Sequence, residues 1–145
     1  MEVLSQGSDL GISMIDRDHR EISELLLEIN FNAARDEDAD RKIRRLRDLA
    51  RVTRSHFLLE EWMMAATNYP GLFLHRQRHA WMLEEIRRLA EHWGKEPSGL
   101  MRESIGYLWE SHIEHVECED QAYGLWLGTT GGKSKLDRAF FLMNP

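Results

Sequence analysis

The chain has little of what several protein classes need. A single cysteine, Cys118, excludes an internal disulfide, and only three prolines interrupt its 145 residues, which favours long helices. No apolar run approaches the roughly 20 residues that cross a bilayer. The first residues show neither the basic start nor the apolar middle of a secretory signal. We therefore expect a cytoplasmic protein without a membrane partner.

Positive charge is also in short supply. The chain has 19 lysines and arginines against 25 acidic residues, which gives a formal net charge of −6. Proteins that bind nucleic acids present basic surfaces to the phosphates, so we expect no nucleic-acid partner. A length of 145 residues suits one ordinary domain with a core of its own.

Apolar residues recur at helical spacing in four long segments. Positions three and four apart predict helices that begin near residues 13, 41, 72 and 100, and no segment alternates as a strand does. We predict an all-α fold, an up-down-up-down four-helix bundle with an irregular N-terminal arm and a C-terminal tail. Residues 1–128 would form the helical domain. Residues 129–145 would form the tail, a possible surface for a protein partner or for self-association.

Two pairs of residues with metal-ligand spacing lie on either side of a predicted turn. His56 and Glu60 are four apart, as are His75 and His79, so each pair lies on one helical face. The intervening segment Asn68–Gly71 contains a proline, which breaks the helix. The sequence therefore predicts two helices that return past each other with their ligand pairs face to face.

Further imidazoles and carboxylates lie in the first and fourth predicted helices. His19 falls within the apolar face of the first. The fourth offers two pairs five residues apart, His115 with Asp120 and His112 with Glu117. Five residues of an α-helix turn by about 500°, which leaves the members of either pair roughly 140° apart, flanking a site. The spacing therefore leaves two registers open, one in which His115 and Asp120 are the ligands and one in which His112 and Glu117 are.

This set of side chains predicts a metal site inside the bundle. Imidazole with carboxylate suits iron, manganese or zinc, whereas a single cysteine argues against copper(I) and iron–sulfur centres. Two carboxylates can bridge two ions, which a single ion would not need. His92 belongs to no such pattern, and we expect it at the surface.

Three pieces of the chain resemble bacterial hemerythrins, in the same order. They are GISMIDRDH, then HFLLEEWMM followed by YPGLFLHRQRH, and finally HVECEDQAYG. The resemblance extends over roughly residues 10–127. It implies a four-helix bundle around two non-haem iron ions, bridged by an oxo or hydroxo group, that bind dioxygen reversibly.

The resemblance also implies individual roles. The ligands that it implies are His75, His79 and His115 for one iron, His19 and His56 for the other, and Glu60 and Asp120 as bridges. The ending of the last motif favours this register over the one with His112 and Glu117. The apolar side chains that we expect around the oxygen pocket are Ile22, Phe57, Trp62, Leu72 and Trp109.

Three functions fit these features. The first is reversible dioxygen binding for storage, delivery or sensing, without enzymatic turnover. The second is a di-iron oxidase or peroxidase that uses the same site, because helical bundles host both kinds of protein. The third is a helical interaction domain whose histidines are vestigial or hold zinc. The resemblance favours the first.

Overall fold

The computed structural model describes residues 9–33, 38–93, 95 and 98–143, and these residues form helices and no strands. The helices are α1 (Ser13–Ala33), α2 (Ala39–Thr67), α3 (Leu72–His92), α4 (Ser98–Glu114), a π-helical segment (His115–Asp120), α5 (Gln121–Thr130) and α6 (Gly132–Met143). The predicted all-α class is confirmed. None of the helices in these residues is both long and apolar enough to span a membrane.

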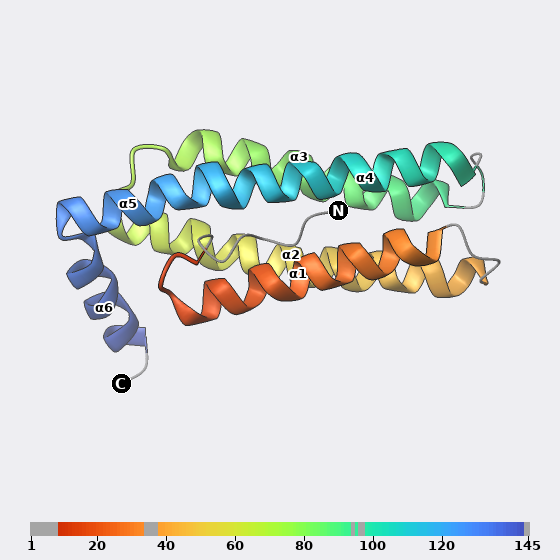
Figure 1. Ribbon diagram of the computed structural model, residues 1–145. Helices are drawn as coiled ribbons and strands as arrows, with labels where there is room; N and C mark the ends of the chain where they lie inside the picture. Colours follow the sequence, from red (N-terminus) through yellow and green to blue (C-terminus); the bar gives the residue numbers. More distant parts are fainter. Residues whose placement is uncertain (1–8, 34–37, 94, 96–97, 144–145) are drawn as a thin grey trace.

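The long helices lie side by side as a bundle (Figure 1). α2 packs against α1 and α3, and α4 packs against the same two helices. The fourth predicted helix consists of α4, the π-helical segment and α5, which follow one another without a break. α5 continues to Thr130 and so crosses the boundary that we predicted at residue 128.

Two apolar clusters fill the bundle. The first, which spans α1 to α4, includes Ile22, Leu49, Ile86, Leu108 and Trp109. The second lies toward α5 and α6 and includes Ile15, Met63, Met64, Tyr123, Leu127 and Leu136. Along each long helix, the predicted ligand residues fall between the positions that belong to these two clusters. A polar layer is therefore enclosed by apolar packing on both sides.

The predicted turn between the second and third helices is present. Asn68 ends α2 in the left-handed conformation at φ 58°, which asparagine tolerates, and its N–H donates to the carbonyl of Ala65. Gly71 precedes α3, and a Cβ there would lie 2.6 Å from a ring carbon of Tyr69. The turn therefore depends on a residue that tolerates the left-handed conformation at one end and on the missing side chain of glycine at the other.

The N-terminal arm is tied to α1 by one carboxylate. Asp16 accepts hydrogen bonds from the backbone N–H groups of Leu10 and Gly11 at 2.7 and 3.1 Å. Ser13 opens the helix, and Asp16 lies inside its first turn. Residues 1–8 of the predicted arm lie outside the described part of the chain.

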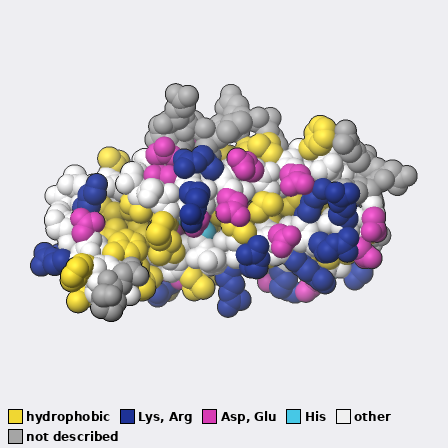
Figure 2. Space-filling view, turned by 90° about the horizontal axis from the view of Figure 1, so that it is seen from below, with side chains coloured by type: hydrophobic (Ala, Val, Ile, Leu, Met, Phe, Trp, Pro, Cys, Tyr) yellow, Lys and Arg dark blue, Asp and Glu magenta, His cyan; other side chains and the backbone are white. Residues whose placement is uncertain are grey.

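Much of the C-terminal tail, whose structure the sequence did not decide, is helical. Gly131 turns the chain at φ 68°, and α6 then packs against α2 and α5. Leu136 is 3 % exposed, and the ring of Phe140 lies 5.2 Å from that of Trp62. Leu136 and Phe140 are four residues apart, so one face of α6 meets the bundle. Figure 2 shows hydrophobic side chains gathered at this end of the molecule.

Candidate metal centre

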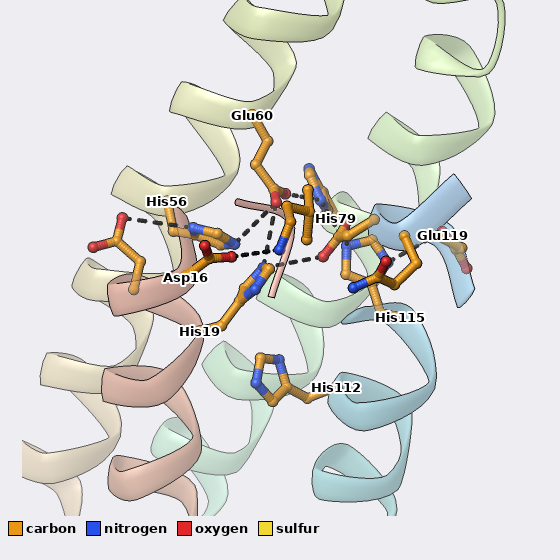
Figure 3. A network of polar contacts seen from close by, with 12 residues as sticks. Asp16, His19, His56, Glu60, His79, His112, His115 and Glu119 are labelled. Atoms are coloured by element: carbon orange, nitrogen blue, oxygen red, sulfur yellow. Dashed lines mark hydrogen bonds and ion pairs between the residues drawn. The ribbon is translucent and has the colours of Figure 1, made fainter. Parts of the chain in front are cut away.

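The predicted ligand residues converge on one region inside the bundle (Figure 3). None of them is more than 3 % exposed: His19, His56, Glu60, His75, His79, His115 and Asp120. They form two groups that share Glu60, and within each group the ligand atoms lie within 4.8 Å of one another. The structure therefore brings together, from α1, α2, α3 and the π-helical segment, all the residues of the preferred register.

The first group surrounds His19 and His56. Glu60 Oε1 lies 3.4 Å from His19 Nε2 and 3.3 Å from His56 Nε2. Asp120 Oδ2 lies 3.1 Å from His19 Nε2. Two imidazole nitrogens and two carboxylate oxygens thus face one point.

The second group contains three imidazoles. Glu60 Oε2 lies 3.6 Å from His75 Nε2 and 3.2 Å from His79 Nε2. Asp120 Oδ1 lies 3.2 Å from the Nε2 atoms of both His75 and His115. The Nε2 atoms of His79 and His115 are 3.0 Å apart.

Glu60 and Asp120 divide their oxygens between the groups. Each carboxylate turns one oxygen to the side with two histidines and the other to the side with three. A carboxylate used in this way can bridge two cations. The side chains therefore define two adjacent cation positions, one with three imidazoles and one with two.

The donor atoms fit cations because most of them face one another as ion pairs but make no hydrogen bonds within the described part of the chain. Both oxygens of Glu60 and of Asp120 and the Nε2 atoms of His19 and His75 are buried, without hydrogen bonds in the described part of the chain. A buried polar group left unsatisfied costs about 1–3 kcal/mol, and more if charged. Imidazole and carboxylate donors suit iron, manganese or zinc. Cations bound here would satisfy these atoms together.

The acids and histidines of the centre alter one another's proton affinity. Burial alone would lower the pKa of His56, but the Glu60 and Asp18 carboxylates outweigh it and raise the pKa to about 10. Burial would also lower the pKa of His75, but the carboxylates of Asp120 and Glu60 outweigh it and raise the pKa to about 9. The neighbouring histidines hold the pKa of Glu60 well below its usual value despite its burial. Protons on histidines therefore balance the carboxylates, a role that cations can take over.

A second shell of carboxylates holds the outer nitrogens of three histidines. Glu61 lies 2.9 Å from His79 Nδ1, and Glu119 lies 3.1 Å from His115 Nδ1. Asp18 Oδ2 lies 3.6 Å from His56 Nδ1. A carboxylate on Nδ1 fixes the ring so that Nε2 faces the centre and becomes a stronger donor.

Arginines hold two of these carboxylates in turn. Arg76 Nε lies 3.1 Å from Glu61, and Arg78 Nε lies 3.6 Å from Glu119. Our predictions from the sequence did not include the acids behind the histidines, although a signal was present. Each of them, Asp18, Glu61 and Glu119, is the direct neighbour in sequence of a predicted ligand.

The π-helical segment explains how His115 and Asp120 meet, and it corrects our expectation that they flank the site. In a π-helix the hydrogen bond runs from residue i to residue i+5, so residues five apart return to nearly the same face. Both side chains therefore point into the centre, with Asp120 Oδ1 3.2 Å from His115 Nε2. The roughly 140° separation holds only for an unbroken α-helix.

The other register does not enter either group. Glu117 is exposed on the outer side of the π-helical segment. His112 is buried beside the centre, where its Nε2 lies 3.1 Å from Ser23 Oγ. Burial and the nearby His19, His115 and His56 lower the pKa of His112 to about 3, so its ring is neutral.

The five apolar side chains expected around an oxygen pocket lie at different places. Phe57 is at the centre, stacked on His79 with the rings 3.6 Å apart and only 4° from parallel. Ile22 and Trp109 belong to the first apolar cluster. Trp62 and Leu72 pack against the second.

His92, expected at the surface, is half-buried at the end of α3, where Nδ1 donates to the carbonyl of Arg88 at 2.9 Å. It contributes to neither group of ligands.

A surface groove reaches the centre from the side of α3. Its volume is about 710 Å³, and its lining includes Tyr69, His75, Arg78, Trp81, Tyr107 and Glu119. The groove is therefore lined by one predicted ligand, His75, and by Glu119, the carboxylate that contacts His115.

Comparison with known proteins agrees with this geometry. The family model described as the hemerythrin HHE cation binding domain matches residues 10–127. No curated protein matched the chain in a sequence comparison. The matched residues include every side chain of the two groups, and they make up most of the chain. The chain therefore belongs to the hemerythrin family of HHE cation-binding domains.

Proposed function

We propose that the chain holds two iron ions and binds dioxygen reversibly, for storage, delivery or sensing, within the up-down-up-down four-helix bundle that the family resemblance implies. The observation that carries the proposal is the division of the Glu60 and Asp120 oxygens between two groups of imidazoles. A site for one ion would not need two carboxylates aimed in two directions. Iron is a metal that this donor set suits, and an iron pair supplies the two electrons that reversible dioxygen binding requires.

The protein residues would set the geometry of such a centre. His75, His79 and His115 would saturate one position, and His19 and His56 would leave the other more open to an external ligand. Second-shell acids hold three of the rings in orientation. Phe57 and the two apolar clusters bury the centre, which strengthens interactions between charges there.

The test is metal content with an optical spectrum, recorded on protein loaded with ferrous iron under anaerobic conditions. We expect two irons per chain and an absorption band that appears with oxygen and disappears when oxygen is removed. His79→Ala should lose iron and the band together, because it removes a donor from the three-imidazole group.

The matched control is His92→Ala, which removes a histidine of the same helix outside the centre and should change neither readout. If His79→Ala kept the full oxygen-dependent spectrum, the assignment of the ligands would be wrong.

A second function, oxidase or peroxidase activity at the same centre, is favoured by the groove beside His75. A volume of about 710 Å³ is in the range of small-molecule sites. The distinguishing measurement is turnover by the iron-loaded protein with hydrogen peroxide and a reducing substrate. Sustained turnover that falls when Trp81→Ala alters the groove would favour the enzyme. Reversible oxygen binding without turnover would favour the carrier.

A further inference from the structure

One buried histidine has no role in the centre as described so far. His112 is 1 % exposed on α4, three residues before His115. Its ring centroid lies 6.4 Å from that of His19, and Figure 3 shows the ring next to the ligands, with one edge turned toward His19 and His115. It is close enough to act on a molecule bound in the centre, and it does not belong to either group of ligands.

The hydrogen bonds of Ser23 determine which nitrogen of His112 carries the ring proton. Ser23 Oγ donates to the carbonyl of His19 at 2.8 Å, and a hydroxyl has only one hydrogen to donate. His112 Nε2, at 3.1 Å from the same oxygen, must therefore be the donor of the second bond. A neutral imidazole has one ring proton, so Nδ1 is left as an acceptor.

The ring of His112 lies beside the ring of His19. His19 belongs to the group with two imidazoles, which offers a cation fewer protein donors than the group with three. An external ligand therefore fits best on the His19 side, next to His112. Ile22, three residues after His19, and Trp109, three residues before His112, belong to the first apolar cluster.

We propose that His112 determines ligand specificity: its Nδ1 accepts a hydrogen bond from a protonated oxygen ligand, water or hydroxide, held on the His19 side of the centre. The inference rests on the proposed di-iron function. A ligand with a proton to donate is stabilised by this contact. An anion without a proton, such as azide, has to displace that ligand and regains no equivalent bond.

Three substitutions separate this role from a structural one. Asparagine places a polar atom near the position of the imidazole Nδ1, glutamine places one near Nε2, and leucine supplies neither. His112→Asn therefore keeps a group toward the centre, His112→Gln keeps the contact with Ser23, and His112→Leu loses both. The readout is the dissociation constant of azide from the diferric protein, with iron content measured for each variant.

We expect His112→Leu and His112→Gln to bind azide more tightly than the parent, by roughly two- to tenfold, the effect of one hydrogen bond. His112→Asn should stay close to the parent. Equal affinities in all four proteins would overturn the proposal. So would a parent-like His112→Gln beside an altered His112→Asn, or loss of iron from both, because His112 would then act through Ser23 on the fold.

Nitrogen NMR of the metal-free protein gives a second test that needs no iron. The expected result is a protonated Nε2 and an unprotonated Nδ1 at His112. A proton on Nδ1 would overturn the proposal even if oxygen binding were established. Conversely, absence of the oxygen band with the predicted azide pattern would reject the proposed oxygen function and leave the role of His112 standing.

Discussion

Glu60 and Asp120 are only 2 % and 0 % exposed. A protein tolerates carboxylates buried this deeply only with compensating charge or hydrogen bonds. In the metal-free chain the compensation comes from protonated histidines, above all His56 and His75. A cation brings the same positive charge without the protons. Metal binding and proton release are therefore two sides of one exchange.

A pH dependence of stability follows from this exchange. His56 and His75 have their pKa raised to about 10 and about 9, above the value of about 6.5 for an unfolded histidine. The stability that they contribute is fully present below about pH 6.5 and is lost as the pH rises through 9 to 10. Urea unfolding should show the metal-free protein weakening over this range more than the metal-loaded protein. A constant difference between the two forms would contradict the exchange.

The second-shell acids give a prediction about affinity. Glu61→Gln keeps the size of the side chain but removes the charge that orients His79, so we expect metal affinity to fall about 10- to 100-fold. A competition assay with a chelator measures this. Glu110→Gln, an exposed acid of α4, is the matched control and should leave affinity unchanged. Equal affinities for the two variants would remove the role of Glu61.

The individual ligand residues could be predicted from the sequence, but the residues that contact the ligands from behind could not. Spacings of four place His56 with Glu60 and His75 with His79 on single faces, whatever the rest of the chain does. The contact of Glu61 with His79 instead joins α2 to α3, so it depends on how two helices pack. The same holds for Ser23 and His112, which lie on α1 and α4.

Among the elements, the π-helical segment gives the sharpest test. It acts as a single extra residue within an α-helix, so deleting the exposed Glu117 should restore α-helical spacing and keep His115 and Asp120 on one face, now four apart. We expect this deletion to retain metal. Inserting an alanine after Glu117 should abolish metal binding, because it rotates Asp120 by about 100° away from His115. Elemental analysis measures the metal content of both proteins. Equal loss of metal from the deletion and the insertion would contradict the role of the π-helical segment.

The α6 helix gives a prediction about stability. Leu136 is 3 % exposed in the second apolar cluster, so Leu136→Ala should lower the free energy of unfolding by about 2–3 kcal/mol. Leu142, which is 78 % exposed on the same helix, is the control, and Leu142→Ala should cost less than about 0.5 kcal/mol. Denaturant unfolding measures both. Similar losses in the two variants would mean that α6 does not pack as described.

Elements with a strong local signal were predictable, and those set by packing were not. Pro70 and the apolar periodicity predicted the turn after α2 and the long helices. The segment HVECED has no residue that marks a π-helix. Its form serves the two inward side chains, His115 and Asp120, which meet partners on other helices. The helix α6 was missed because a short amphipathic segment becomes ordered only where it finds a surface.

At the scale of the molecule, a polar layer lies between two apolar clusters. Helical periodicity predicted the apolar faces, and the ligand positions interrupt each face at the same level, so the layer could be inferred before the structure. The place of α6 at one end could not. Self-association or partner binding through the tail stays a prediction, to be tested by comparing the oligomeric state of the full chain with that of a chain ending at residue 131.

The proposed function requires a pair of irons that acts as one oxygen-binding unit. The most direct measurement is oxygen uptake by the ferrous-loaded protein, together with iron content. We predict two irons per chain, one dioxygen bound for each iron pair, and full recovery of the dioxygen when its pressure is lowered. One iron per chain, or oxygen that is consumed and not released, would contradict the account.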